Sequence, residues 1–209
     1  MPCTSIVARA ELRHRFRRDD TMGMPAPLQR WTRERVLALP HDGHRHELVG
    51  GELLVTPAPR VLHELVVRAL YDRIAPFVRA HGLGIAMSGP ADLAFGADEV
   101  LQPDLFVVPR GFSPLAAWSD LPRPLLVVEV TSPASAEADR GVKRRRYLEA
   151  GIPEYWVVDP DRRHVERFRP GAARTEVVTG RLTWQPGGES PQLEVDLVEV
   201  LAEVWEGSR

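Results

Sequence analysis

The chain has 209 residues, of which 44% are hydrophobic and 27% are charged, a balance typical of a globular domain with room for a tail. Its longest apolar stretch, from Pro124 to Val130, is far shorter than the ~18 residues of a membrane span, which excludes a membrane-embedded protein. The single cysteine, Cys3, excludes an internal disulfide and a cysteine-based zinc site, and the N-terminus lacks the apolar core of a signal peptide, so we expect a cytoplasmic protein with no membrane partner.

The charges are unevenly distributed along the chain. The formal net charge of −2 does not by itself favour binding to nucleic acid. However, residues 140–169 hold nine lysines and arginines against five acidic residues, whereas residues 170–209 hold three against seven. A local basic patch attracts phosphate groups more than the total charge does. The basic segment is therefore either a solvated helix face of mixed charge or part of a nucleic-acid interface.

The N-terminal residues differ in composition from the rest of the chain. They hold five arginines between positions 9 and 18 and show no sustained hydrophobic periodicity. We interpret residues 1–30 as a disordered tail, with Met22 or Met24 as alternative starts of translation. Residues 31–209 are then predicted to form one domain.

Three elements are predicted at the start of this domain. A short helix is expected over residues 32–39, because Pro40 ends it. Residues 46–55 are predicted to form two strands around Gly50-Gly51, since glycine tolerates the positive φ that a tight hairpin needs. The clearest helix is predicted over residues 62–78, where apolar residues recur at helical spacing.

The middle of the domain is predicted to consist of strands. A short strand is expected at residues 85–87. Residues 91–95 and 101–108 are predicted to pair as a hairpin around a turn at 96–98. The near-continuous apolar stretch 124–131 is typical of a central strand that is buried on both faces.

The C-terminal part of the domain is predicted to alternate between helix and strand. A helix is expected over residues 136–150, followed by a buried strand at 155–158. Further elements are a peripheral hairpin of residues 164–168 and 175–178, a strand at 182–184, and a last amphipathic helix capped by Asp196. This order predicts an α/β sandwich: a central mixed β-sheet flanked by helices, with a peripheral C-terminal hairpin and helix.

Two carboxylates stand in apolar strand sequences. Glu129 lies within Leu125-Leu126-Val127-Val128-Glu129-Val130, and Asp104 heads Leu105-Phe106-Val107-Val108. Burying a carboxylate without a partner is costly, so each is either paired with a basic side chain or faces a cleft and binds a metal. Two carboxylates that converge from neighbouring strands suffice for Mg²⁺, which can activate water and neutralise the charge on an attacked phosphate.

The helix predicted after Glu129 supplies a third group. Asp139, Lys143 and Tyr147 are spaced four residues apart, so they share one helix face. The short link from Glu129 lets that face lie over the end of the strand, where a lysine can orient water or stabilise developing negative charge. The alternative is an Asp139–Lys143 surface pair, which stabilises a protein by only ~0.3–0.5 kcal/mol.

Other polar residues are weaker candidates. Arg140, Arg144, Arg145 and Arg146 surround Lys143, and they would contact a phosphate backbone if this helix faced nucleic acid. The three histidines between positions 41 and 46 lack the further ligands of a standard zinc site, so a solvated loop is the better interpretation.

A set of motifs in fixed order resembles a known family. The set comprises Glu47 to Glu52, His63, Gln102-Pro103-Asp104, Val128 to Pro133, Asp139, Lys143, Tyr147 and Gly151 to Pro160. Over roughly residues 30–205 it resembles the Uma-two family of restriction-endonuclease-like proteins, which belongs to the PD-(D/E)xK nuclease superfamily. The Glu129 motif followed by Glu154-Tyr155-Trp156 is its most specific part. The resemblance implies a restriction-endonuclease-like sandwich.

The resemblance also implies roles for the central residues. Asp104 matches the aspartate of the "PD" element, and Glu129 matches the acidic residue of the "(D/E)xK" element; both are metal ligands in the superfamily. The lysine of that element would stand at position 131, where this chain has Thr131. The Uma-two pattern is similar in lacking a lysine there, and Lys143 on the next helix takes its place.

The remaining family positions imply accessory roles. Glu47, or alternatively Glu52, matches the acidic residue that completes the metal site. His63 also matches a family position, without a defined role. Asp139 and Tyr147 are accessory candidates on the helix of the substituting lysine.

The function implied is that of a Mg²⁺-dependent endonuclease that hydrolyses phosphodiester bonds in nucleic acid, with DNA as the expected substrate. Mn²⁺ is expected to substitute for Mg²⁺, and a homodimer would suit the cutting of both strands. The displaced lysine leaves a second hypothesis open, a catalytically degenerate nuclease fold that binds DNA or a protein partner. A third is a purely structural interaction module. The sequence leaves open whether the substrate is DNA or RNA, whether it is single- or double-stranded, and which nucleotide sequence is recognised.

Overall fold

A mixed six-stranded sheet forms the centre of the fold in the computed structural model, which describes residues 30–206. In spatial order the strands are β3 (Ile85–Ser88), β5 (Leu105–Val108), β6 (Leu126–Val130), β7 (Tyr155–Asp159), β8 (His164–Phe168) and β9 (Glu176–Val178). Neighbouring strands β6 and β7 run parallel, and the other neighbouring pairs are antiparallel, which confirms the predicted mixed sheet.

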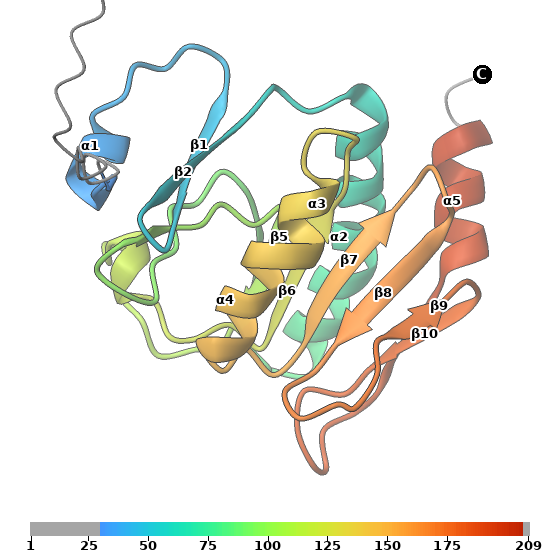
Figure 1. Cartoon of the computed structure of the whole chain (residues 1–209). Coiled ribbons are helices and arrows are strands. Elements are labelled where there is room, and N and C mark those ends of the chain that lie inside the picture. The colour runs from blue at the N-terminus through green and yellow to red at the C-terminus, as the bar shows by residue number, and fades with distance from the viewer. Residues whose placement is uncertain (1–29, 207–209) are drawn as a thin grey trace, which may run out of the picture.

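Helices cover both faces of the central sheet, as predicted (Figure 1). The helices of one face are α2 (Val61–Ala80) and α5 (Leu197–Glu206), and those of the other are α3 (Ala136–Ala138) and α4 (Arg144–Glu149). Side chains of β6 and β7 alternate between the two sides: Val128 and Trp156 belong to the core under α2, whereas Val127 and Tyr155 belong to the core under α4. Burial on both faces explains why the sequence of these strands is almost continuously apolar.

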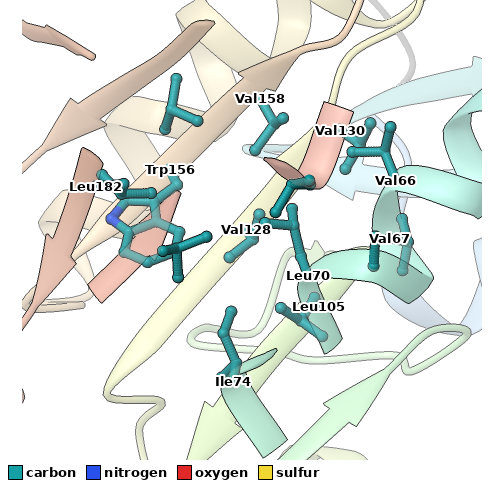
Figure 2. Close-up of a cluster of buried hydrophobic side chains, with 14 of the residues drawn as sticks. Val66, Val67, Leu70, Ile74, Leu105, Val128, Val130, Trp156, Val158 and Leu182 are labelled. Carbon is teal, nitrogen blue, oxygen red and sulfur yellow. The ribbon is translucent and has the colours of Figure 1, made fainter. Parts of the chain in front are cut away.

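Helix α2 anchors the larger core, which Figure 2 shows. Its buried residues Val66, Leu70 and Ile74 recur at helical spacing and lie over the sheet beside Leu105 and Val128. Each such side chain stabilises the fold by about 1.5–3 kcal/mol when fully buried. The predicted helix is thus confirmed. Among the described helices, none has both the length and the apolar character needed to cross a membrane.

A second, three-stranded sheet stands beside the central one. Its strands, in the order β2-β1-β4, are β1 (Arg45–Val49), β2 (Glu52–Thr56) and β4 (Glu99–Val100). The predicted hairpin turns at Gly50 and Gly51, whose φ angles of 60° and 86° favour glycine. Helix α1 (Arg33–Leu37), whose first turn donates to the Thr32 hydroxyl, packs against this sheet through the buried Val36.

The helix predicted over residues 136–150 is interrupted by a π-helical turn, η2 (Asp139–Lys143), between α3 and α4. Its end is confirmed by Gly151, which has a φ of 75° just beyond the helix. A π-turn inserts an extra residue per turn and is often found at functional sites. Here it lies directly over the end of β6, and both Asp139 and Lys143 are buried.

One predicted pairing is wrong. Residues 91–95 and 101–108 meet only at an isolated bridge between Leu93 and Leu101. Strand β4 pairs instead with β1, and β5 lies between β3 and β6. The physical reason is that all four residues of β5 are fully buried, so a central place with two neighbouring strands suits it better than a hairpin.

The predicted C-terminal hairpin is confirmed: residues 164–168 and 175–178 pair antiparallel as β8 and β9, at the edge of the central sheet. It joins that sheet because β8 also pairs with β7. The strand predicted at residues 182–184 is β10 (Arg181–Trp184), which forms a further hairpin with β11 (Leu193–Asp196). The last helix is confirmed: α5 packs on α2, and the Asp196 carboxylate accepts hydrogen bonds from the backbone of Val198 and Glu199. The predicted tail lies outside the described residues, apart from Arg30.

Candidate active site

Glu129 lies near the end of β6, buried to 1% exposure among apolar neighbours. Its side chain is directed to the α4 face of the sheet, as expected from its alternation with Val128. The Oε1 atom lies 2.8 Å from the Lys143 ammonium and accepts a hydrogen bond of 3.0 Å from the Tyr147 hydroxyl. The partners that a buried carboxylate requires thus come from the helical segment that follows the strand.

Lys143 joins three carboxylates. Its ammonium lies 3.1 Å from Glu47 Oε1 and 3.3 Å from Asp139 Oδ1, in addition to the contact with Glu129. The lysine side chain is 2% exposed, so this is not the surface pair that the sequence left open. The π-turn holds Asp139 and Lys143 together, while β1 supplies Glu47 and β6 supplies Glu129.

Asp104, just before β5, lies next to this cluster. Its Oδ2 accepts a hydrogen bond of 2.7 Å from the Val130 amide and lies 3.0 Å from His63 Nε2. Its Oδ1 accepts a hydrogen bond of 2.8 Å from the Arg45 guanidinium. Because Val130 follows Glu129 directly, the Asp104 and Glu129 carboxylates are neighbours at one end of the sheet.

Arg45 belongs to the site but was not identified from the sequence. It lies two residues before Glu47 in β1, and alternate residues of a strand point to the same face. This strand directs Arg45 and Glu47 to one side and the buried Leu48 to the other. The alternation along the strand sequence could therefore have indicated that Arg45 lies on the same side as Glu47. Arg45 also donates a hydrogen bond of 3.1 Å to the Gln102 carbonyl, which ties β1 to the segment before Asp104.

The structure distinguishes Glu47 from Glu52. Glu47 is 2% exposed and accepts a hydrogen bond of 2.8 Å from the backbone amide of Gln102, in addition to its contact with Lys143. Glu52 is exposed at the start of β2, across the hairpin turn. Only Glu47 of the two acidic candidates is therefore placed in the cluster.

Burial and charge shift the pKa of several groups in the cluster. Burial raises the pKa of Glu129 well above its usual value against the opposing effect of Lys143, and the neighbouring carboxylates raise it further. Burial alone would lower the pKa of Lys143, but Glu129, Glu47 and Asp139 raise it well above its usual value. Lys143 is therefore a permanent cation within a group of acids that compete for positive charge.

Asp104 and His63 each shift the pKa of the other. Burial raises the pKa of Asp104, but the hydrogen bond from His63 and the charge of Arg45 outweigh it and lower that pKa below its usual range. Burial of the His63 ring lowers its pKa, but the hydrogen bond and charge of Asp104 outweigh this effect and raise it. Asp104 is consequently an ionised carboxylate, held by a guanidinium and an imidazole.

The cluster has an excess of acidic groups. Four carboxylates (Glu47, Asp104, Glu129 and Asp139) face two permanent cations, Arg45 and Lys143. Asp139 Oδ1 is buried and makes no hydrogen bond, although it lies near the ammonium. A cavity of about 20 Å³ touches all four carboxylates, which is enough for one water-sized group.

These donors fit a hard divalent cation. Mg²⁺ is held by one or two carboxylates and keeps several waters, and the adjacent Asp104 and Glu129 supply such a pair of oxygen ligands. Within residues 30–206, no three acidic, imidazole or thiol groups form a ready-made ligand set. The reason is geometric: the Lys143 ammonium occupies the point on which Glu47, Glu129 and Asp139 converge.

Comparison with known proteins places the chain in a family. The profile of the Uma2 family, described as "Putative restriction endonuclease", matches residues 33–202. The chain belongs to the Uma2 family. The resemblance read from the motifs is thereby confirmed, and so is the restriction-endonuclease-like fold that it implied.

A solved structure shares the Uma2 fold. The crystal structure of "a putative nuclease belonging to DUF820" from Anabaena variabilis ATCC 29413 superposes with a TM-score of 0.64 at 21% sequence identity. The match covers 83% of this chain and 99% of the other. At this identity the likeness establishes the fold alone. A comparison with curated proteins finds no match.

The arginines around Lys143 are mostly engaged within this Uma2 domain. Arg140 pairs with Asp159 and Glu166, and Arg146 pairs with Glu99 and Glu149. The Arg144 guanidinium lies 5.0 Å from the centre of the Phe168 ring, whereas Arg145 is exposed. Contact with a phosphate backbone stays a prediction for these residues, of which Arg145 is the one with an exposed side chain.

Proposed function

We propose that this Uma2 protein is a metal-dependent endonuclease that hydrolyses phosphodiester bonds in nucleic acid, with DNA as the expected substrate and Mg²⁺ as the metal. The observation that supports it best is the contact of 2.8 Å between Lys143 and Glu129. It brings a lysine from the following helix to the carboxylate of the "(D/E)xK" element, although Thr131 occupies the usual position of that lysine. Family membership and fold support the same reaction class.

In this proposal, Asp104 and Glu129 hold the metal, and Glu47 stands beside them. When bound, the ion supplies Lewis acidity that activates a water and neutralises charge on the attacked phosphate. Lys143 orients that water or stabilises the negative charge that develops, because its ammonium lies directly at Glu129.

The surrounding residues hold these groups in place. Arg45 and His63 fix the two oxygens of Asp104, and the Val130 amide binds the same carboxylate. Tyr147 fixes Glu129 by its hydroxyl. Such a supporting shell restricts the orientation of the reactive carboxylates, and losses of 10–100-fold are typical when one of its members is removed from a metal site.

A second candidate is a catalytically degenerate nuclease fold that binds DNA or a protein partner. The sharing of one ammonium by three carboxylates favours it, because a cation already neutralises part of the cluster without any metal. This candidate predicts binding of metal or nucleic acid with no turnover, and it keeps the same fold and cluster.

A cleavage panel tests the first candidate against the second. Purified protein is incubated with supercoiled plasmid, linear duplex, single-stranded DNA and RNA, each in Mg²⁺, Mn²⁺ and EDTA. We expect cleavage of at least one DNA substrate in Mg²⁺ or Mn²⁺ and none in EDTA, because the excess carboxylates need a divalent cation to bind a phosphate.

The same panel identifies the substrate class from the substrate that is cut fastest. Calorimetric titration of Mg²⁺ into the protein is run in parallel. A folded protein that binds Mg²⁺ but cuts none of the four substrates would contradict the endonuclease and support the degenerate binding module. Cutting that persists undiminished in EDTA would contradict the role of the metal.

A further inference from the structure

A large cleft opens beside the acidic cluster, on the side away from Lys143. It has a volume of about 700 Å³, within the range of about 300–1,000 Å³ of small-ligand sites. Its walls are the face of α2 that bears Arg68 and Tyr71, the loop that bears His41 and His44, and the turn at residues 88–90. It is therefore much larger than the cavity within the cluster, and residues 58–59, 102 and 104 complete its walls.

The inner end of the cleft coincides with the proposed reaction centre. Asp104, His63 and Arg45 line both the cleft and the small cavity that reaches Glu129 and Lys143. A phosphate held at Asp104 and Glu129 would therefore have its neighbouring nucleotide within this cleft. The cleft lies where the substrate of the proposed function must continue.

The side chains of the cleft suit a nucleotide. Tyr71 is partly buried and packs against the core under α2, so its ring is held firmly. Arg68, one helical turn earlier on the same face, has an exposed side chain whose Nε pairs with Asp72 at 2.8 Å. An aromatic ring offers a stacking surface for any base, and an adjacent arginine offers a cation for the backbone.

We propose that this cleft binds one unpaired nucleotide next to the scissile phosphate, with Tyr71 as the stacking surface and Arg68 as the backbone contact. The proposal rests on the nuclease function and specifies its substrate: a single strand, or a duplex with an extruded or frayed nucleotide. A base that stays paired and stacked in a duplex cannot enter such a pocket, so regular duplex must first lose a nucleotide from its stack.

A binding measurement tests this proposal independently of cleavage. A fluorescein-labelled single-stranded oligonucleotide of about 12 nucleotides and its blunt duplex are titrated with the full chain in EDTA, and fluorescence anisotropy is recorded. We expect the single strand to bind more tightly than the duplex. Tyr71→Ala is expected to weaken binding of the single strand about ten-fold, because base stacking on an aromatic side chain is lost, whereas Tyr71→Phe retains the ring and the affinity.

Matched variants distinguish binding in the cleft from a general effect of lost positive charge or of a disturbed fold. Arg68→Ala is expected to weaken binding, whereas Arg79→Ala, which removes an exposed arginine of the same helix outside the cleft, leaves it unchanged. Circular dichroism checks the fold of each variant. If Tyr71→Ala does not fold, the affinities of Arg68→Ala and Arg79→Ala for the single strand are compared instead. Equal affinities of these two exposed-site variants would then overturn the cleft proposal.

The outcomes for the cleft and for the enzyme are distinguishable. Equal affinity for single strand and duplex, or equal affinity of Tyr71→Ala and Tyr71→Phe, would overturn the cleft proposal, even if the protein cuts DNA. Binding that depends on Tyr71 and Arg68, without cleavage in Mg²⁺ or Mn²⁺, would support the cleft and contradict the nuclease function.

Discussion

Replacing Lys143 with alanine is expected to lower the free energy of unfolding by about 3–5 kcal/mol, because it leaves buried carboxylates without their cation. Three of them, Glu47, Glu129 and Asp139, lie within 3.3 Å of the ammonium, and the lysine side chain is 2% exposed. Cleavage is expected to be lost at the same time. Urea denaturation of wild type and variant, followed by circular dichroism, measures the difference.

A matched variant and a double mutant make this prediction sharper. Arg145→Ala removes an exposed cation from the same helical segment and is expected to change stability by no more than about 0.5 kcal/mol. Adding Glu129→Gln to Lys143→Ala removes one of the stranded charges and is expected to restore part of the loss. A Lys143→Ala variant as stable as Arg145→Ala would contradict the view that the ammonium holds the cluster together.

Replacing Glu129 with glutamine is expected to reduce metal-dependent cleavage by roughly 10²-fold or more, because a carboxylate ligand is lost next to the charge that develops on the phosphate. Glutamine has nearly the same size and can still accept the hydrogen bond from Tyr147, so the fold should persist. Initial rates of plasmid cleavage and a thermal melt of each protein test both parts of the prediction.

Glu52→Gln is the matched control for this change. Glu52 is an exposed acid on β2, outside the cluster, and its amide variant is expected to cut at the rate of wild type. If Glu129→Gln cuts as fast as Glu52→Gln, the assignment of Glu129 as a metal ligand fails. A Glu129→Gln variant that does not fold would instead indicate a structural role for the carboxylate.

Much of the fold was predictable because local pattern and tertiary burial agree. The helical spacing of α2 and the almost continuously apolar sequences of β6 and β7 indicate their burial directly. The Gly50-Gly51 turn fixes the first hairpin. Helix α2 covers one face of the sheet that contains β6 and β7, so the sandwich architecture follows from the order in which helices and strands occur.

Strand pairing was less predictable, since partners distant in sequence decide it. The apolar character of β5 does not reveal that β3 and β6 are its neighbours and that β4 turns away to β1. By contrast, the pairing of β8 with β9 was predicted, because these two strands follow each other in the sequence.

The part of the candidate site that could be predicted consists of charged side chains whose burial is costly. Asp104 and Glu129 stand out because a charge in an apolar strand requires a partner. Lys143 follows from the helical segment that a short link joins to the Glu129 strand. Arg45 was missed because its partner, Asp104, lies in a distant segment of the chain, and the choice between Glu47 and Glu52 depends on which side of the hairpin faces the cluster.

The most direct test of the proposed nuclease compares wild type with Asp104→Asn on supercoiled plasmid in Mg²⁺. Asp104 is an ionised carboxylate fixed by Arg45, His63 and the Val130 amide, and asparagine keeps its shape while removing the charge. We predict Mg²⁺-dependent conversion of the plasmid by wild type and a rate lower by roughly 10²-fold or more for the folded variant. Equal rates for the two proteins, or no conversion by wild type, would contradict it.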